Sequence, residues 1–351
     1  MRFDIAMPAH LSDLFMAPQP AHLRGPQPIA TVIIDTEEDF DWQTPIEGTP
    51  HETAYLHHLD QLIPILRAYK AVPTLLLTFP ILENPTIVAQ LRRMAERGDC
   101  ALGLQLHAWV TPPFAGQSRS DMSFASNLDS DIEAQKLENL YQKFRACFAF
   151  PPLVFRSGRY GLGRHTARLI SALGITIDTS VAPCTSMADE GGPDYSRINF
   201  EPFWFGDDHK LLELPLCRSI IGWGGAYGRI AYRRLMQPGR QRQMIGAVLA
   251  RLGCAERVTL SPEGNGARAA RRLTNALIAR DQRILPLSFH SSSIWPGRNP
   301  YVRNRRDLHR FFDDLSAMLT DLADRHGCRF VRTDEIPALL APPLLRHQAP
   351  A

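Results

Sequence analysis

Acidic residues, two histidines and an arginine follow short apolar segments of this sequence. Four acids fall within residues 35–39, directly after the apolar run 29–34. His107, Arg156 and His290 end or follow three later apolar runs. Neighbouring carboxylates repel one another unless a metal ion or an arginine lies among them. A solvated acidic loop would explain the acids alone, whereas acids, histidines and an arginine together indicate metal-assisted or acid–base chemistry.

The elements that position these residues alternate between strands and helices. Short β-branched segments predict strands, and longer segments with helical periodicity lie between most of them. This alternation requires parallel strands joined by crossovers, in an open doubly wound sheet or in a closed barrel. Seven or more such units favour an α/β fold with a single distorted (β/α) barrel of about seven parallel strands. The expected strands are 29–34, 72–78, 101–106, 153–155, 174–177, 211–214, 258–260, 284–289 and 329–331.

One domain explains the distribution of these residues better than two. In a parallel barrel the carboxyl ends of all strands meet at one face, and that face carries the active site. Asp35 and His290 lie at opposite ends of the sequence, so no single cut leaves a complete site in either half. We therefore expect an irregular N-terminal arm over residues 1–28, a barrel over residues 29–340 and a C-terminal tail over residues 341–351.

Composition and motifs exclude several other classes of protein. The 351 residues are 44% hydrophobic, and 39 basic residues nearly balance 36 acidic ones, so we expect a globular protein that does not bind nucleic acid. No segment is long and apolar enough to span a membrane, and residues 1–28 lack the pattern of a secretory signal. A cytoplasmic protein with six free cysteines is the expectation. The sequence contains no G-x-S-x-G, H-E-x-x-H or phosphate-binding motif.

Five segments of the sequence resemble the motifs of the polysaccharide deacetylase (NodB-homology, carbohydrate esterase family 4-like) superfamily, in particular its branch labelled WalW-like. The resemblance covers most of residues 30–335, and the order and spacing of the segments on successive strands carry it. The segments are Ile33-Ile-Asp-Thr-Glu-Glu-Asp-Phe-Asp-Trp42, Leu102-Gly-Leu-Gln-Leu-His-Ala-Trp-Val-Thr-Pro-Pro-Phe114, Phe155-Arg-Ser-Gly-Arg-Tyr-Gly161, Ile177-Asp-Thr-Ser180 and Leu287-Ser-Phe-His-Ser-Ser-Ser293.

The resemblance implies a metal-dependent hydrolase that removes an N-acetyl or related acyl group from a carbohydrate or glycolipid precursor. It implies that Asp35 is the base, that Arg156 positions this base and that His290 is the acid. The base takes a proton from water, the metal stabilises the oxyanion, and the acid protonates the leaving amine. A divalent cation, with zinc favoured, is the implied cofactor, and its implied ligands are His107 and one of three acids, namely Glu37, Glu38 or Asp39.

The sequence departs from the family pattern at the metal ligands. The usual second motif has two histidines four residues apart, whereas Thr111 lies four residues after His107, and Gln105 occupies the other plausible ligand position. Amides are poor zinc ligands. The metal site is therefore expected to bind weakly unless another acid from residues 35–39, or His290, completes the coordination.

Further polar and aromatic residues at the strand ends are candidates for contact with a carbohydrate or amino-sugar substrate. Two alternatives to the deacetylase remain open: a carbohydrate-binding barrel that has lost its metal and its activity, and a related hydrolase that cleaves a non-sugar amide. The candidate substrate-binding residues are Gln105, Trp109, Tyr160, Asp178 and Glu263.

Overall fold

The computed structural model describes residues 18–40, 52–114, 123–163, 165–206, 210–235 and 252–343. Most of the expected arm and tail lies outside these residues. Within the arm, Gln19–Pro20 forms the short strand β1, and Leu23 bridges to Leu340. No helix of the described residues is long and apolar enough to cross a membrane.

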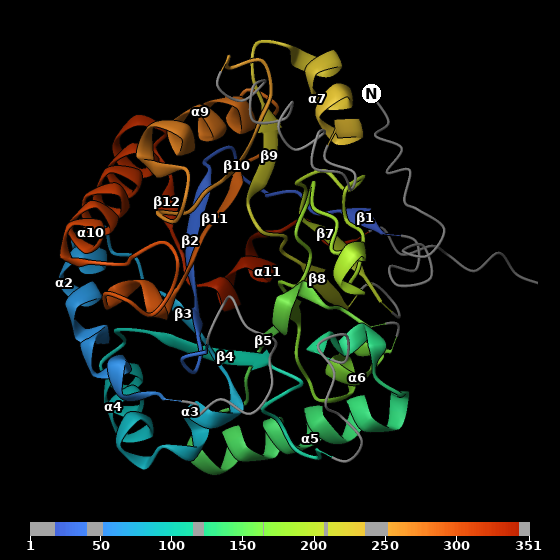
Figure 1. Cartoon of the computed structure of the whole chain (residues 1–351), viewed down its shortest axis with the longest axis vertical. Coiled ribbons are helices and arrows are strands. Elements are labelled where there is room, and N and C mark those ends of the chain that lie inside the picture. Colours follow the sequence, from blue (N-terminus) through green and yellow to red (C-terminus); the bar gives the residue numbers. More distant parts are fainter. Residues whose placement is uncertain are drawn as a thin grey trace, which may run out of the picture.

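Seven parallel strands form the centre of the molecule (Figure 1). They include all but two of the strands expected from the sequence, and each pairs in parallel with its neighbour. The fold is therefore α/β with a large, mostly parallel sheet. In spatial order the strands are β11 (Ile284–His290), β2 (Ile29–Thr36), β3 (Thr74–Leu77), β4 (Ala101–Leu106), β5 (Val154–Ser157), β6 (Ile177–Asp178) and β8 (Leu211–Glu213).

The expected barrel is not closed by a continuous ladder. In the described residues β8 and β11, the two ends of the parallel sheet, do not pair with each other. After β8 the chain turns into β9 (Arg218–Ile221), which pairs antiparallel with β10 (Glu256–Thr259). Isolated backbone hydrogen bonds link the segment after β10 to both sides of the gap: the Leu260 amide donates to the Cys217 carbonyl at 2.8 Å, and the Ser288 amide donates to the Leu260 carbonyl at 3.2 Å. The antiparallel ribbon thus occupies the place of the closing ladder.

Three further strands of the described residues, β1, β7 (Phe203–Phe205) and β12 (Arg329–Phe330), belong to the same sheet. The strand β7 pairs antiparallel with β8 and with β1. The strand β12 pairs in parallel with the first two residues of β2, before the residues of β2 that pair with β3. These strands extend the sheet but carry no candidate site residue.

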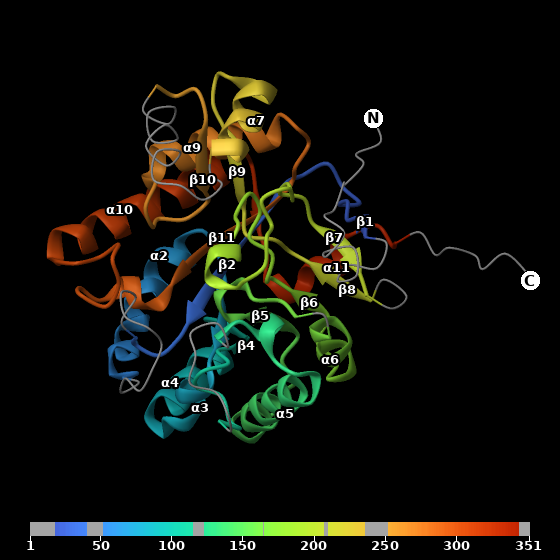
Figure 2. The same cartoon turned by 45° about the vertical axis from the view of Figure 1, so that its right-hand side comes forward.

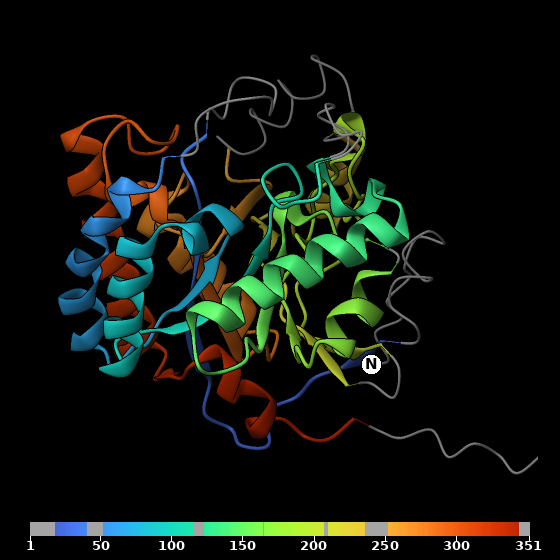
Figure 3. The same cartoon turned by 90° about the horizontal axis from the view of Figure 1, so that it is seen from below.

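Helices cover the outer face of the sheet. Figure 1 shows α9 and α10 along one side, and Figure 3 shows α5 crossing another. Figure 2 shows α7 beside β9, away from α5. The helices are α2 (Leu62–Ala68), α3 (Phe79–Glu83), α4 (Pro85–Glu96), α5 (Ser130–Cys147), α6 (Thr166–Ala172), α7 (Gly225–Leu235), α9 (Gly266–Ile278), α10 (Arg305–Thr320) and α11 (Ile336–Leu339).

The alternation of side chains along β2 divides the core into two parts. Successive residues of a strand point to opposite faces. Ala30, Val32 and Ile34 pack in the large cluster under the helices, whereas Ile29 and Ile33 pack in a smaller inner cluster that includes Ile336 of α11. Asp35 lies two residues after Ile33 and six after Ile29, so its side chain points to the same face as theirs. The fold therefore directs the Asp35 carboxylate to the inner face, at the carboxyl end of the sheet.

Candidate active site

Asp35 and Arg156 form a buried ion pair at the inner face of the sheet. Arg156 Nη1 lies 2.5 Å from Asp35 Oδ1 and 2.7 Å from Oδ2, and both side chains are at most 3% exposed. Arg156 Nε donates to the carbonyl and the hydroxyl of Thr179, both at 3.0 Å. These contacts fix the guanidinium, so the Asp35 carboxylate has a defined orientation.

His290 faces Asp35 from the neighbouring strand. The two residues are register partners in the β11–β2 ladder, and His290 Nε2 lies 3.6 Å from Asp35 Oδ2. Glu263 holds the other ring nitrogen: Nδ1 lies 2.8 Å from Glu263 Oε2, and the His290 backbone amide donates to Oε1 at 2.9 Å. Burial lowers the pKa of His290, but the charges of Glu263 and Glu37 outweigh it and raise this pKa to about 10. The His290 imidazole is therefore protonated on both ring nitrogens, and positively charged, near neutral pH.

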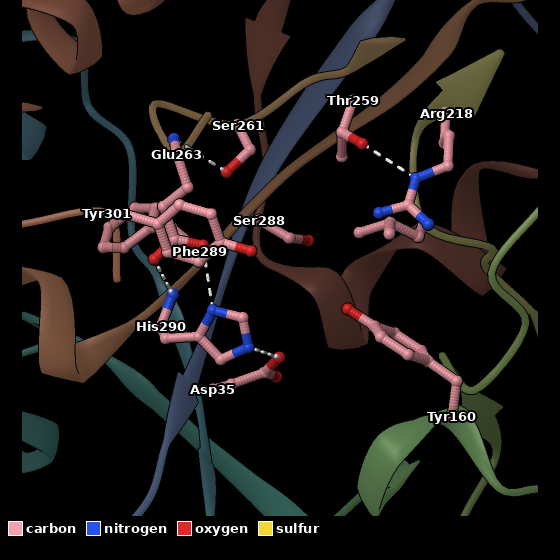
Figure 4. A pocket seen from close by; sticks show the side chains of 11 residues that line it. Asp35, Tyr160, Arg218, Thr259, Ser261, Glu263, Ser288, Phe289, His290 and Tyr301 are labelled. Carbon is pink, nitrogen blue, oxygen red and sulfur yellow. Dashed lines mark hydrogen bonds and ion pairs between the residues drawn. The ribbon is translucent and has the colours of Figure 1, made fainter. Parts of the chain in front are cut away.

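A small pocket opens beside Asp35 and His290 (Figure 4). Its cavity volume is about 60 Å³, which is room for a few water molecules. Tyr160 reaches this pocket from the turn after β5, where Arg159 and Tyr160 adopt the left-handed conformation at φ 52° and 57°. This conformation is costly for residues other than glycine and is concentrated at functional sites. The remaining lining residues are Leu216, Arg218, Thr259, Ser261, Glu263, Ser288, Phe289 and Tyr301.

A second cluster surrounds His107, one residue after β4. His107 Nδ1 lies 2.8 Å from Glu38 Oε1, and His107 Nε2 lies 3.4 Å from Glu37 Oε2. Gln105 Nε2 lies 3.0 Å from His107 Nε2 and 3.3 Å from Glu37 Oε2. All four side chains are buried. One atom each of Glu37, Gln105 and His107 thus forms a triangle with edges of 3.0, 3.3 and 3.4 Å.

Charges within this cluster are strongly coupled. Burial lowers the pKa of His107, but the carboxylates of Glu38 and Glu37 outweigh it and raise this pKa to about 9. Burial raises the pKa of Glu37, and the positive charges of His290 and His107 oppose that effect. Glu38 at Nδ1 and Glu37 near Nε2 favour a proton on each ring nitrogen, or a metal ion in place of one of these protons.

The triangle fits a divalent cation in part. Ligand atoms around tetrahedral zinc lie about 3.3 Å apart when the bonds are about 2.0–2.1 Å. Gln105 Oε1 and Glu37 Oε1 are buried without a hydrogen-bond partner, and a half-turn of the amide would place Oε1 of Gln105 in the triangle. Glu38 orients the ring through Nδ1, as carboxylates do for ligand histidines. In the described residues no three His, Cys, Asp or Glu side chains are grouped to hold a metal, so a metal ion at this triangle would need the Gln105 amide as its third ligand.

Two of the candidate residues lie away from both clusters. Asp39 forms an ion pair with Arg298, and its amide donates to the Glu52 carbonyl at 2.8 Å. Asp178 is fully buried and accepts a hydrogen bond from Ser180 Oγ at 2.5 Å. Because Ile177 packs in the inner cluster, the next residue points to the outer face. Asp178 therefore lies behind Arg156 and does not line the pocket.

Trp109 and Glu263 have contacts beyond the substrate role expected of them. Trp109 stacks on His107, with ring centroids 4.1 Å apart, and also lines an open groove of about 520 Å³ beside Phe114. Glu263 lines the pocket, but its carboxylate holds His290. Gln105 belongs to the His107 cluster and Tyr160 to the pocket.

The structure adds residues that sequence reasoning missed. Ser291 Oγ accepts a hydrogen bond from the Glu37 amide at 3.3 Å, and Tyr55 donates to the Glu37 carbonyl at 2.6 Å. Ser291 directly follows His290, which is a signal that the sequence does offer. Arg218 and Tyr301 enter the pocket from segments with no strand-end signal, because the antiparallel ribbon and a long connection carry them there.

Comparison with known proteins supports the fold. No protein-family model matches the sequence, and no curated protein matches it significantly. Among solved structures, Puue allantoinase superimposes with a TM-score of 0.52 at 12% identity, over 90% of this chain and 91% of that one. The chain shares the fold of this allantoinase.

Polysaccharide deacetylases are also among the similar solved structures. A protein of Mycobacterium smegmatis assigned to the polysaccharide deacetylases has a TM-score of 0.47 at 14% identity, over 94% of this chain and 98% of that one. The peptidoglycan deacetylase PdaC of Bacillus subtilis has a TM-score of 0.38 at 11% identity, over 90% of this chain and 93% of that one. The WalW-like branch stays a prediction.

Proposed function

We propose that this protein hydrolyses the C–N bond of an acylated amine, as a deacetylase acting on a carbohydrate or amino sugar. The relation between Asp35 and His290 carries the proposal, because a fixed carboxylate and a protonated imidazole face each other at 3.6 Å beside a pocket. A base and an acid so placed are what amide hydrolysis requires.

The two residues divide the proton transfers. Asp35 takes a proton from a water molecule, whose oxygen attacks the acyl carbon. The C–N bond of the tetrahedral species then breaks, and His290 Nε2 donates its proton to the departing nitrogen. A carboxylic acid and a free amine leave. Arg156 holds Asp35 and Glu263 holds His290, so the distance between base and acid is set by buried contacts.

We also propose that a divalent cation, zinc being the first choice, binds at the His107 cluster. Glu37, His107 and Gln105 would hold it, with Glu38 orienting the imidazole. Such an ion would polarise the acyl carbonyl and stabilise its developing negative charge. One nitrogen and two oxygen ligands, one of them an amide, predict weaker zinc binding than a site with two histidines.

Aromatic side chains beside the site support a sugar substrate. The groove next to His107 is lined by Trp109 and by Phe114, whose side chain is 57% exposed. An exposed ring with a wide groove beside it can stack on the apolar face of a pyranose. A carbohydrate would then lie along this groove, with its acyl group directed toward Asp35.

Release of acetate from N-acetylglucosamine oligomers tests the activity. We expect turnover by the unaltered protein and at least a hundredfold loss in Asp35→Asn and in His290→Gln. Asp60→Asn, at an exposed position, serves as the matched control and should keep full activity. Full activity in Asp35→Asn would overturn the proposal. Release of an acyl group from small amides, with none from N-acetyl sugars, would replace the sugar by a non-sugar amide.

Elemental analysis of protein purified without chelator tests the metal. We expect up to one equivalent of a divalent ion in the unaltered protein and loss of that ion in His107→Ala. The absence of a second histidine at Thr111 is the observation that favours the other candidate function, a carbohydrate-binding protein without activity. Metal-free protein that binds glycans but shows no turnover with any divalent ion would support that candidate instead.

A further inference from the structure

Arg218 stands across the pocket from Asp35 and His290. Figure 4 shows its guanidinium pointing into the pocket, with Tyr160 on one side and Ser288 beyond it. Arg218 Nε donates to Thr259 Oγ1 at 2.8 Å, and Nη1 donates to Thr185 Oγ1 at 2.6 Å. Both acceptors are neutral hydroxyls. No ion pair of the described residues includes Arg218.

A second arginine increases the positive charge at this end of the pocket. Arg257 lies on β10, two residues before Thr259, and Thr259 is the register partner of Arg218. Arg257 Nη1 donates to the Cys184 carbonyl at 3.2 Å. Burial, followed by the charge of Arg257, lowers the pKa of Arg218. A guanidinium nevertheless stays charged in proteins. A partly buried cation without a counter-ion is costly, so such a residue is retained where a ligand supplies the negative charge.

The acids of the pocket cannot serve as this counter-ion. The Asp35 carboxylate is held by Arg156, and the Glu263 carboxylate is held by His290. The pocket is therefore divided into an end with the proposed base and acid and an end with an uncompensated guanidinium. A ligand that spans it would place its reacting group at the first end and a negative group at the second.

Size and neighbouring donors favour a carboxylate over a larger anion. The cavity is small, about 60 Å³, so it suits a compact anionic group of a ligand whose sugar ring lies outside the cavity. Ser288 Oγ, which is buried without a hydrogen-bond partner, lines the same pocket, as do the hydroxyls of Tyr160 and Tyr301. A guanidinium and hydroxyl donors match the two oxygens of a carboxylate.

We propose that Arg218 binds a carboxylate of the substrate, so that the acylated amine cleaved by this protein is an acid, such as an N-acyl amino sugar in its uronate form. The identity of the reaction rests on the proposed function. The anion site does not, because it follows from the charges of the pocket alone.

Binding of glucuronate and glucose by calorimetry tests the anion site without any turnover. These probes differ in one carboxylate. We expect the unaltered protein to bind glucuronate at least tenfold more tightly than glucose, with a preference that weakens as salt is raised. Arg218→Gln should lose the preference, Arg218→Lys should keep part of it, and Arg303→Gln, at a side chain that is 74% exposed, should keep all of it.

Three results would overturn the inference. The first is equal affinity of the unaltered protein for glucuronate and glucose, which requires no variant to fold. The second is a preference that survives in Arg218→Gln. The third is tighter binding of inorganic phosphate than of glucuronate, which would assign the site to a different anion.

Hydrolysis of a matched pair of substrates separates this inference from the proposed function. Acetate release is compared between N-acetylglucosamine and its uronate counterpart. We expect kcat/KM to favour the uronate, and Arg218→Gln to remove that difference mainly through KM. If neither compound is hydrolysed while glucuronate binding still depends on Arg218, the proposed function fails and the anion site stands. A preference for the uronate that is unchanged in Arg218→Gln contradicts the anion site and leaves the hydrolase in place.

Discussion

One nitrogen of Arg156, Nη1, contacts both carboxylate oxygens of Asp35, at 2.5 and 2.7 Å, with both side chains buried. Each charge lost its hydration when the chain folded, and each depends on the other for compensation. The pair therefore serves two purposes. It orients the proposed base, and it makes the stability of the fold depend on the intact Asp35–Arg156 pair.

Removing only Arg156 should destabilise the protein strongly. Arg156→Met leaves the Asp35 carboxylate buried without its partner, and we expect a loss of about 3–5 kcal/mol in the free energy of unfolding. The double variant with Asp35→Asn should lose less than the sum of the two single variants. Urea unfolding of the four proteins measures this coupling.

An ion pair with an exposed carboxylate provides the matched control for that cycle. Arg283 Nε lies 3.0 Å from Asp281 Oδ1, and the Asp281 side chain is 81% exposed. Solvent screens such pairs, so the corresponding cycle with Arg283→Met and Asp281→Asn should give a coupling below about 1 kcal/mol. Additive losses at Arg156 and Asp35 would show that the buried pair is not coupled as we infer.

The rate of hydrolysis should depend on pH through Glu263. His290 acts as the acid only while protonated, and because its pKa is raised to about 10, activity should fall as the pH rises through about 10. The negative charge of Glu263 is the largest effect that raises this pKa. Glu263→Gln removes the charge, so the alkaline limb of the profile should move to lower pH. The profile of kcat/KM against pH is the measurement.

A control variant that leaves the pKa of His290 unchanged is needed, because Glu263→Gln could also lower the rate by disturbing the structure. Glu138→Gln changes an exposed carboxylate on α5, and its profile should coincide with that of the unaltered protein. If Glu263→Gln lowers the rate equally at every pH, Glu263 supports the fold at this point but does not set the acid's pKa.

The sequence predicts most strands, and it predicts that the proposed base and acid lie at the carboxyl ends of β2 and β11, because each follows a clear apolar run. Asp178 shows where this reasoning ends. Its strand, β6, has two residues, Ile177 and Asp178, so nothing in the sequence says which of them faces inward. Asp39 likewise belongs to the acidic run but pairs with Arg298, a residue 259 positions away.

The closing side of the sheet was also beyond sequence reasoning. The alternation of strands and helices predicts another parallel strand after β8, whereas the chain forms the antiparallel pair β9–β10 there. Arg218 begins β9 and reaches the pocket for that reason. Antiparallel and parallel strands have the same local sequence pattern when both faces are covered, so only the structure reveals this pairing.

Lys136 should be essential for the loop that follows His107. This lysine of α5 is buried, and its Nζ donates to the carbonyls of Ala108, Thr111 and Pro113 at 2.9, 2.5 and 2.6 Å. Lys136→Met leaves three carbonyls without this donor, so we expect a loss of about 2–4 kcal/mol in the free energy of unfolding. We also expect faster proteolysis after His107. Urea unfolding and limited proteolysis measure these effects.

The control for this variant lies on the same helix. Lys143→Met removes a lysine that contacts the Phe79 ring at 5.9 Å, and it should cost less than about 1 kcal/mol. Equal stability of the Lys136→Met and Lys143→Met proteins would mean that the three carbonyls find other donors and that the loop does not depend on Lys136.

Glu133 should make the protein less stable as the pH rises toward neutrality. Burial raises the pKa of Glu133 to about 7, and the hydrogen bond from Thr166 only partly opposes it. In the unfolded chain a glutamate has a pKa of about 4.3. Between these two values the folded state holds a proton that the unfolded state has released, so stability falls as the pH rises through this window and levels off above about 7. Below about pH 4 both states are protonated and the effect vanishes.

Glu133→Gln should therefore stabilise the protein at pH 8 by up to about 3 kcal/mol, and have little effect at pH 4. The amide oxygen can still accept the hydrogen bond from Thr166, while the cost of a buried charge is gone. Unfolding by urea at a series of pH values measures the difference, with the exposed Glu138→Gln on the same helix as control. A difference between the Glu133→Gln and unaltered proteins that is independent of pH would show that Glu133 is ionised in both states and that its charge is compensated in the fold.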